Sequence, residues 1–225
     1  MKKTFVLSVL CVAALAFAVS AMAADHGVIT INGGSQAVAM RGHAGKVTAP
    51  RLPMKKPLYS NFNSDTSNLY NSSTGWTISD GNILGEEFTA ANSFKSPRTT
   101  KVTSIISALS WAGGTQENLV ELVKDCKGQP CKVDYQGKGT LCHAKAKVTQ
   151  TFGSCCAVVK TSCKASLHKG TTYWIIMESI DTDNTFTVWN WSNASNANGP
   201  DDYSLNDAAW ASNGSGNPQG AFSIQ

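Results

Sequence analysis

The stretch KVTSIISALSW, residues 101–111, decides the fold class of this chain of 225 residues. Side chains of a strand point alternately to its two faces, and this stretch has apolar side chains on both. One face carries Val102, Ile106 and Ala108, and the other carries Ile105, Leu109 and Trp111. A strand that is apolar on both faces is typical of the interior of a β-sandwich, where both faces are covered.

The rest of the chain repeats this chemistry in short pieces. Runs rich in β-branched and aromatic residues, which favour strands, are EEFTAANSF (86–94), TTYWIIMESI (171–180), NTFTVWNW (184–191) and GAFSIQ (220–225). The segments between them are rich in Gly, Pro, Asn and Asp, the residues of turns. The pattern predicts an all-β fold, an antiparallel β-sandwich of the jelly-roll type. The run QENLVELVKDC (116–126) also fits one helix face, but the strands around it favour a strand.

The first 23 residues have the layout of a secretory signal peptide. Lys2 and Lys3 precede an apolar run over residues 4–19, and AMA (21–23) fits the rule for signal cleavage. We therefore expect cleavage after Ala23 and a protein that is secreted or periplasmic. The apolar run is short for a membrane span, and no second run of about 18 apolar residues follows, so no transmembrane segment is expected in the mature chain.

Residues 24–56 differ in composition from the segment that follows them. They are rich in Gly, Ala and Pro, and they predict a flexible basic leader that could contact an acidic cell surface. Their one acidic residue is Asp25, and their basic residues are Arg41, Lys46, Arg51, Lys55 and Lys56. Within the leader HGVITING (26–33) could form a short strand, and one β-sandwich domain is expected over 57–225. The mature chain is otherwise nearly balanced in charge, which argues against a nucleic-acid partner.

The six cysteines that follow the signal peptide are expected to form three disulfides, because their number is even and the chain is exported. Cys126 and Cys131 enclose a KGQP turn that can bring them close. If residues 139–150 and 156–163 form one hairpin that turns at TFGS, Cys142 and Cys163 lie opposite each other. That arrangement leaves Cys155 and Cys156 to bond to each other.

Other uses of the adjacent pair Cys155–Cys156 stay open at this stage. The spacing of the cysteines lacks the CxxC elements typical of zinc sites. The histidines stand in no recognisable nucleophile–base signature for a catalytic thiol. A redox-active bond between the two cysteines is a further alternative.

Tryptophan is frequent in this chain, and Trp189 and Trp191 share one face of a predicted strand. With Asn190 and Asn193 beside them, they could form a platform on which a sugar ring stacks. The predicted partner is then a glycan of the cell surface or matrix. The alternative is that these large aromatic side chains fill the core of the sandwich.

Aspartate and asparagine gather in SIDTDNT (179–185) and NGPDDYSLND (198–207). Their oxygen atoms could bind calcium, although the same residues are common in ordinary turns. The candidate ligands are Asp181, Asp183, Asp201 and Asp202. No other cofactor is indicated, because the sequence has no phosphate-binding loop, GxSxG or HExxH motif.

Several motifs, in their order along residues 57–225, resemble the choice-of-anchor R domain, a family of exported bacterial modules. The similar stretches are GWTIS (75–79), Phe88, TSIISALSWAGGT (103–115), LVELVKD (119–125) with the turn Gly128–Pro130, TFGSCC (151–156), LHKGTTYWI (167–175) and GAFSI (220–224). Members differ in how, or whether, they attach to the cell, so the resemblance implies a surface role and transfers no catalytic residues. This chain shows no sorting motif or apolar tail, which implies release or periplasmic residence.

Three hypotheses about function follow from the sequence. The first is an exported, non-catalytic β-sandwich that binds at a cell surface or matrix. The second is a secreted hydrolase of polysaccharide or peptide, which would need two of the spaced carboxylates to face each other across a cleft. Those carboxylates are Glu86, Glu87, Glu117, Glu121 and Glu178. The third is a structural or assembly subunit that uses an open sheet edge or the basic leader.

Overall fold

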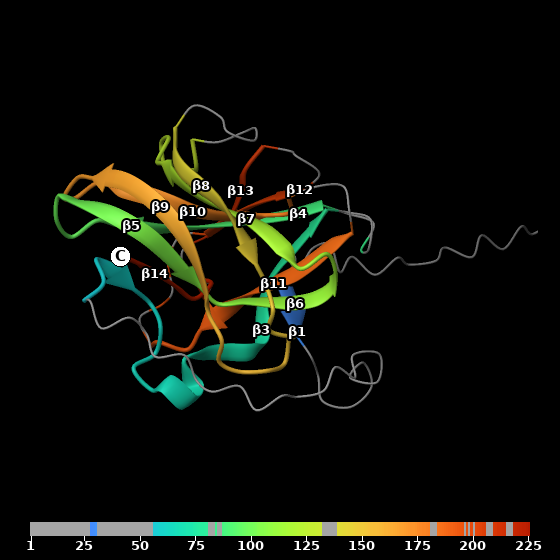
Figure 1. Cartoon of the computed structure of the whole chain (residues 1–225). Helices are drawn as coiled ribbons and strands as arrows, with labels where there is room; N and C mark the ends of the chain where they lie inside the picture. The colour runs from blue at the N-terminus through green and yellow to red at the C-terminus, as the bar shows by residue number, and fades with distance from the viewer. Residues whose placement is uncertain are drawn as a thin grey trace, which may run out of the picture.

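The structure is a computed structural model of the chain, and its described part is an all-β fold (Figure 1). The described residues are 28–30, 56–80, 84, 87–131, 139–180, 184–195, 197, 199, 201–205, 209–214 and 218–225, with the backbone alone at 28–30, 201–205 and 213–214. The predicted signal peptide, most of the predicted leader, Glu86, Asp181 and Asp183 lie outside them. No helix in this part of the chain is long and apolar enough to cross a membrane.

The strands form two antiparallel sheets, as the sequence predicted. The large sheet contains β1 (Val28–Thr30), β3 (Tyr70–Asp80), β4 (Glu87–Lys95), β6 (Leu109–Gly114), β7 (Glu117–Lys124), β8 (Thr140–Lys147), β10 (Thr172–Glu178), β11 (Thr185–Ser192), β12 (Asp201–Leu205) and β13 (Ala211–Gly214). The small sheet contains β2 (Tyr59–Ser60), β5 (Thr100–Ser107), β9 (Val159–Leu167) and β14 (Phe222–Ile224). The ambiguous run 116–126 contains the strand β7, whose side chains are buried on both faces, Val120 and Leu122 in the main core and Val123 in a smaller cluster.

The large sheet curls around the small one (Figure 1). Its main path runs β6–β11–β3–β4–β10–β7–β8, and the small sheet runs β2–β14–β5–β9. Strands β3 and β4 are consecutive in the chain but pair only at Ser79–Phe88 and Asp80–Glu87. Beyond these pairs they diverge, and β10 pairs with β4 in place of β3. The divergence lets the large sheet close over the core.

The stretch 101–111 is two strands rather than one, which corrects the prediction. It leaves the small sheet at the end of β5 and enters the large sheet at the start of β6, with Ala108 between them. The Ala108 N–H donates to the carbonyl of Ala221 at 3.0 Å, and its carbonyl accepts from the Asn190 N–H at 2.9 Å. The stretch is apolar on both faces because it passes through the interior from one layer to the other.

The core lies between the two sheets and is rich in aromatic rings. Tyr59 and Phe222 of the small sheet have ring centroids 5.0 Å apart, and Tyr59 lies 5.2 Å from Phe94 of the large sheet. Trp189 of the large sheet lies 5.8 Å from Phe222. A smaller cluster, which includes Ile106 and Cys156, covers one end of β5. Rings of this size bury large apolar areas and therefore dominate the stability of the sandwich.

Three disulfides join the predicted pairs, Cys126–Cys131, Cys142–Cys163 and Cys155–Cys156. The hairpin from which the second pair was inferred does not form. Cys142 lies on β8, which pairs with β7 in the large sheet, and Cys163 lies on β9, which pairs with β5 in the small sheet. The bond therefore ties the edge strands of two different sheets. The Cα atoms of Cys142 and Cys163 are 5.4 Å apart, so these two edge strands approach each other as closely as paired strands of one ladder.

Replacing Cys142 and Cys163 together by Ala is expected to lower the free energy of unfolding by about 3 kcal/mol, because the bond closes a loop with a sequence separation of 21 residues. The matched control replaces Cys126 and Cys131, whose separation is 5 residues, with an expected loss of about 2 kcal/mol. Urea unfolding measures both values. An equal or larger loss in the control would show that the bond between the sheets contributes no more to stability than the local Cys126–Cys131 bond.

Candidate functional site

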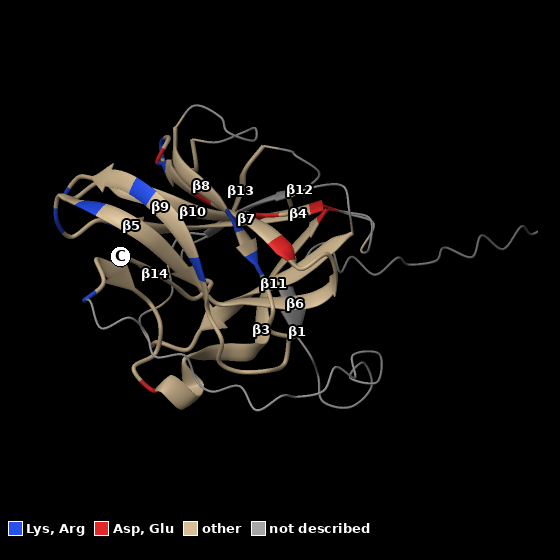
Figure 2. Cartoon of the chain, in the orientation of Figure 1, with Lys and Arg blue, Asp and Glu red and all other residues tan. Residues whose placement is uncertain are grey.

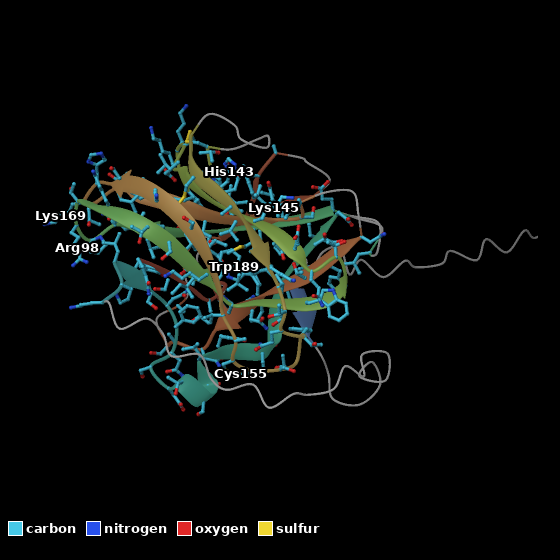
Figure 3. All side chains as sticks on the ribbon, viewed as in Figure 1. Arg98, His143, Lys145, Cys155, Lys169 and Trp189 are labelled. Atoms are coloured by element: carbon cyan, nitrogen blue, oxygen red, sulfur yellow. A yellow bond between two sulfur atoms is a disulfide. The ribbon has the colours of Figure 1, made fainter. Side chains whose placement is uncertain are left out.

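The predicted aromatic platform is not on the surface, because Trp189 is completely buried. Figure 3 shows it in the interior, where its Nε1 donates to the carbonyl of Ala221 at 3.1 Å. Gly220 packs against the face of its ring, with no space for a side chain. Trp191 is half-buried and stands edge-on to Trp76, with ring centroids 5.5 Å apart. Trp189 thus lies in the core, as the alternative interpretation has it, and Trp191 packs against the core from the side.

Asn190, a predicted glycan ligand, is also completely buried and connects strands instead. Its Oδ1 accepts from the hydroxyl of Ser110 on β6 at 2.6 Å, and its Nδ2 donates to the carbonyl of Asn71 on β3 at 3.0 Å. Its backbone N–H donates to Ala108, and its carbonyl accepts from the Ala221 N–H at 2.8 Å. Because it is completely buried, the Asn190 side chain cannot contact an external sugar in this structure.

The variant Asn190→Ala is expected to lower the free energy of unfolding by about 2–4 kcal/mol, because the Ser110 hydroxyl and the Asn71 carbonyl lose their buried partner. Asn193→Ala is the control, since Asn193 reaches the surface, and a change within about 0.5 kcal/mol is expected. Thermal and urea unfolding of both variants give the values. Comparable stability of the two variants would contradict the structural role of Asn190.

Asn193 lies at one end of the sandwich, beside the adjacent cysteines. Its Nδ2 donates to Oδ1 of Asn68 at 2.6 Å, in the short 3₁₀ helix Thr66–Asn68. The Ser67 carbonyl of the same helix lies 4.0 Å from Sγ of Cys155 and 3.8 Å from Sγ of Cys156. A disulfide sulfur has no proton to donate, so these are packing contacts. The helix therefore contacts two segments that are far apart in the sequence, Asn193 after β11 and the adjacent cysteines 155 and 156.

A buried polar pair holds the loop that carries the adjacent cysteines. The Tyr70 hydroxyl donates to the carbonyl of Ala157 at 2.8 Å and accepts from Nε2 of Gln150. The Gln150 amide also donates to the carbonyl of Ser154 and accepts from the Ala157 N–H, both at 2.5 Å. Cys156 is buried and Cys155 is exposed. These hydrogen bonds to Tyr70 and Gln150 hold the loop in place, which favours a structural role for the Cys155–Cys156 bond.

Burial also shifts the pKa of two tyrosines in this half of the molecule. Burial raises the pKa of Tyr59 to about 12, from its ordinary value of 10.0. It raises the pKa of Tyr70 as well, against the opposing effect of the Gln150 hydrogen bond. Each folded-state pKa lies above that of the unfolded chain, so above pH 10 the unfolded chain loses the phenol proton while the folded protein keeps it, and this ionisation favours the unfolded state.

The stability of the protein is therefore expected to fall as pH rises from 10 towards 12, by about 1.4 kcal/mol per pH unit for each tyrosine. Below pH 10 both tyrosines are neutral in the folded and in the unfolded state, so they add no pH dependence to the free energy of unfolding there. Urea unfolding at several pH values measures this. The double variant Tyr59→Phe and Tyr70→Phe should remove most of the slope above pH 10, and an unchanged slope would contradict the assignment.

The predicted calcium ligands do not form a described site. Asp201 and Asp202 belong to β12 rather than to a loop, opposite Asn92 and Ala91 of β4, and their side chains lie outside the description. Asp181 and Asp183 also lie outside it. Among the described residues no group of three or more His, Cys, Asp or Glu could hold a metal ion. Calcium binding at these positions stays a prediction.

The spaced carboxylates lie mainly on the outer face of the large sheet. Glu121 of β7 stands opposite His143 of β8 and Ile176 of β10, and Glu178 stands opposite Leu119. Glu121 is completely buried, so its carboxylate cannot reach a substrate in this structure. The Glu117 carboxylate lies 3.9 Å from Nζ of the exposed Lys145, an ion pair of small value in water. This arrangement gives the hydrolase hypothesis no support.

The described charged side chains on the outer surface of the small sheet are all basic. Strand β9 alternates strictly, with Thr161, Cys163 and Leu167 buried and the even-numbered positions between them exposed. The exposed positions are Lys160, Ser162, Lys164 and Ser166. Lys101 and Thr103 of β5 are exposed beside them. Neither 96–107 nor 159–171 contains Asp or Glu, so the cations on this surface have no acidic neighbour within their own strands.

Two connected turns extend this surface at one end. The Gly170 N–H donates to the carbonyl of Ser96 at 2.8 Å, and the Lys169 N–H donates to Oγ1 of Thr99 at 3.0 Å. These bonds hold the exposed side chains of Arg98 and Lys169 at the same end (Figure 3). We call Arg98, Lys101, Lys160, Lys164 and Lys169 the basic face.

Among the described residues basic side chains occur on both sheets, whereas acidic side chains are absent from the small sheet. Figure 2 shows Lys and Arg on β5, β9 and the turn between β4 and β5, and also on β8 of the large sheet. The described carboxylates lie at the 3₁₀ helix or in and beside the large sheet, at Asp65, Asp80, Glu87, Glu117, Glu121, Asp125 and Glu178. The sequence analysis placed the basic excess in the leader and missed this face, because the average charge of the domain is nearly neutral. The alternation of Lys and Ser over 160–166 was the available signal.

Comparisons with known proteins leave the family open. No family model matches the chain, and no curated protein matches it. One solved structure that it resembles contains the cysteine protease and lectin-like domains of Cwp84, a surface layer associated protein of Clostridium difficile. The identity is 14%, the match covers 62% of this chain and 31% of the other, and the TM-score is 0.39. The matched region thus spans about a third of that structure, and a likeness of this size carries no argument about function.

Proposed function

We propose that this protein is an exported, non-catalytic binding module that attaches to an anionic polysaccharide of the cell surface or matrix. The observation that carries the proposal is the basic face, three cationic side chains on the outer surface of the small sheet and two in the turns at its end, with no carboxylate in their segments. A surface of one sign attracts a polymer of the opposite sign and raises the rate of encounter. The chemistry required is binding and orientation, and no bond is made or broken.

The shape of the basic face favours a linear polymer. Lys160 and Lys164 lie on the same side of β9, about 13 Å apart along the strand at 3.3 Å per residue. The cations continue through Lys101 to the turn of Arg98 and Lys169, so the face is an elongated strip (Figures 2 and 3). A linear chain with regularly spaced carboxylates or sulfates can contact several of them at once.

The neutral residues between the cations favour sugar over lipid. The exposed hydroxyls of Thr103, Ser162 and Ser166 alternate with the lysines, and they can exchange hydrogen bonds with the hydroxyls of a polysaccharide. Membrane surfaces are bound more firmly when apolar side chains enter the interface. Among the described residues the one exposed large apolar side chain is Leu84, which does not lie on this face. The resemblance to choice-of-anchor modules also supports a role at the cell surface.

The test compares two double variants that remove the same charge. Lys160→Gln with Lys164→Gln should weaken binding to heparin or alginate about 30-fold, at about 1 kcal/mol for each basic residue facing an anionic surface. Lys124→Gln with Lys127→Gln, two exposed lysines at the end of β7, should change it less than about threefold. Titration calorimetry or biolayer interferometry at two salt concentrations measures both, and affinity should fall as salt rises.

Three results would overturn the proposal. Equal losses in the two double variants would show an effect of net charge alone. Equal binding to neutral dextran would show that the cations are not involved. Tighter binding to double-stranded DNA than to either polysaccharide, in the same buffer, would identify a different class of partner.

A further inference from the structure

Among the described residues of the domain, those from 56 onward pair with only part of one edge of β3. Strand β11 pairs along the other edge, from Ser192–Tyr70 to Phe186–Ser79. On the edge in question β4 pairs only with Ser79 and Asp80 before it diverges. The segment that covers this edge at Thr74–Trp76 is β1 (Val28–Thr30), with Ile29 opposite Gly75.

The acceptor edge is shaped by the core rather than by β1. Trp76 is buried and its Nε1 donates to the carbonyl of Pro218 at 3.1 Å. A side chain at Gly75 would come within 2.5 Å of the Trp189 carbonyl and of Cγ1 of Val188. Strand β3 is thus pressed against β11 at the point where β1 pairs. The edge therefore has its pairing geometry before a strand arrives, and an edge of this kind binds other strands readily.

The covering strand is distant in the chain from the sheet that it joins. Residues 31–55 separate β1 from the next described residue, Lys56. A connection of this length can span up to about 85 Å when extended, far more than the width of the domain. The predicted cleavage after Ala23 would leave only four residues before Val28, so the strand would lie at a free chain end. Such a strand can pair with its own β3 or with that of a neighbour at similar cost.

We propose that β1 is an exchangeable strand, and that the β3 edge at Thr74–Trp76 accepts the Val28–Thr30 strand of a second copy of this chain. The donor and the acceptor are different surfaces of the molecule, so the contact can be closed by a two-fold axis between two copies or repeated from copy to copy. Two copies can exchange strands reciprocally, or many copies can join head to tail. Either product gathers several basic faces in one assembly, which strengthens attachment to a repetitive polymer.

Disulfide trapping between two different variants tests the exchange. Thr30 stands directly opposite Thr74, and opposed positions of antiparallel strands are close enough for a bond between introduced thiols. One chain, lacking only the predicted signal peptide, carries Thr30→Cys, and the other carries Thr74→Cys. Mixed under mild oxidation, they should give a dimer linked between positions 30 and 74, identified by peptide mapping without reduction. Its yield should rise with protein concentration.

Two controls make the result specific to strand pairing. Ser73→Cys, an exposed neighbour of the acceptor position, replaces Thr74→Cys and should reduce the linked dimer at least tenfold. Val28→Pro with Ile29→Pro in the donor should do the same, because one of the two backbone N–H groups must point at β3 and proline removes it. Both control chains keep the acceptor edge and the core unchanged apart from the introduced thiol.

A chain that carries both cysteines separates the alternatives. If it closes only within one molecule, and the mixture of single variants gives no linked dimer at any concentration, β1 serves its own domain and the proposal is overturned. If neither the doubly substituted chain nor the mixture forms the bond, β1 does not pair with β3, which also overturns it. Equal yields from Ser73→Cys and Thr74→Cys would show random collision of thiols and have the same consequence.

Discussion

The junction at Asn190 is the constraint on which the rest of the structure depends. Three backbone hydrogen bonds link Ala108, Asn190 and Ala221, which come from the β5–β6 crossing, from β11 and from the start of β14. The Asn190 side chain adds bonds to Ser110 and Asn71. Both sheets are therefore hydrogen-bonded to one residue, Asn190. The chain at Ala108 needs these partners, because a strand that leaves a sheet loses its ladder hydrogen bonds. The junction therefore fixes the position of the large sheet over the small one at this edge.

The remaining connections between the sheets act at the other edge. Cys142 and Cys163 join β8 to β9, and the loop of Cys155 and Cys156 is held by Tyr70 and Gln150. With one edge held by backbone bonds and the other by a disulfide, the small sheet is positioned without help from its outer surface. That surface can accordingly carry charges of one sign, whose mutual repulsion is reduced by spacings comparable with the screening length of about 10 Å.

The sequence predicted features that depend on local chemistry. Strands followed from alternation and β-branched composition. The pair Cys126–Cys131 followed from the turn that it encloses and Cys142–Cys163 from opposed positions, although these two proved to be opposed across two sheets. The alternation of side chains is the same whether a strand stays in one sheet or passes to another, so the sequence did not predict the crossing at Ala108. The roles of Trp189 and Asn190 also depended on their partners. On a surface, an Asn beside two Trp residues suggests a platform for a sugar. In a core, the same Asn connects strands by hydrogen bonds, and only the burial of these side chains distinguishes the two roles.

The same reasoning explains why the basic face carries information about function. In β9 the odd-numbered positions are determined by the core, since Thr161, Cys163 and Leu167 are buried. The even-numbered positions face water, where many residue types are tolerated at a cost within about 0.5 kcal/mol. The fold does not require lysine at 160 or 164, and a strand of low charge would serve equally well. Repetition of lysine and serine at positions that stability leaves unconstrained is therefore better explained by a binding partner than by the packing of the sandwich.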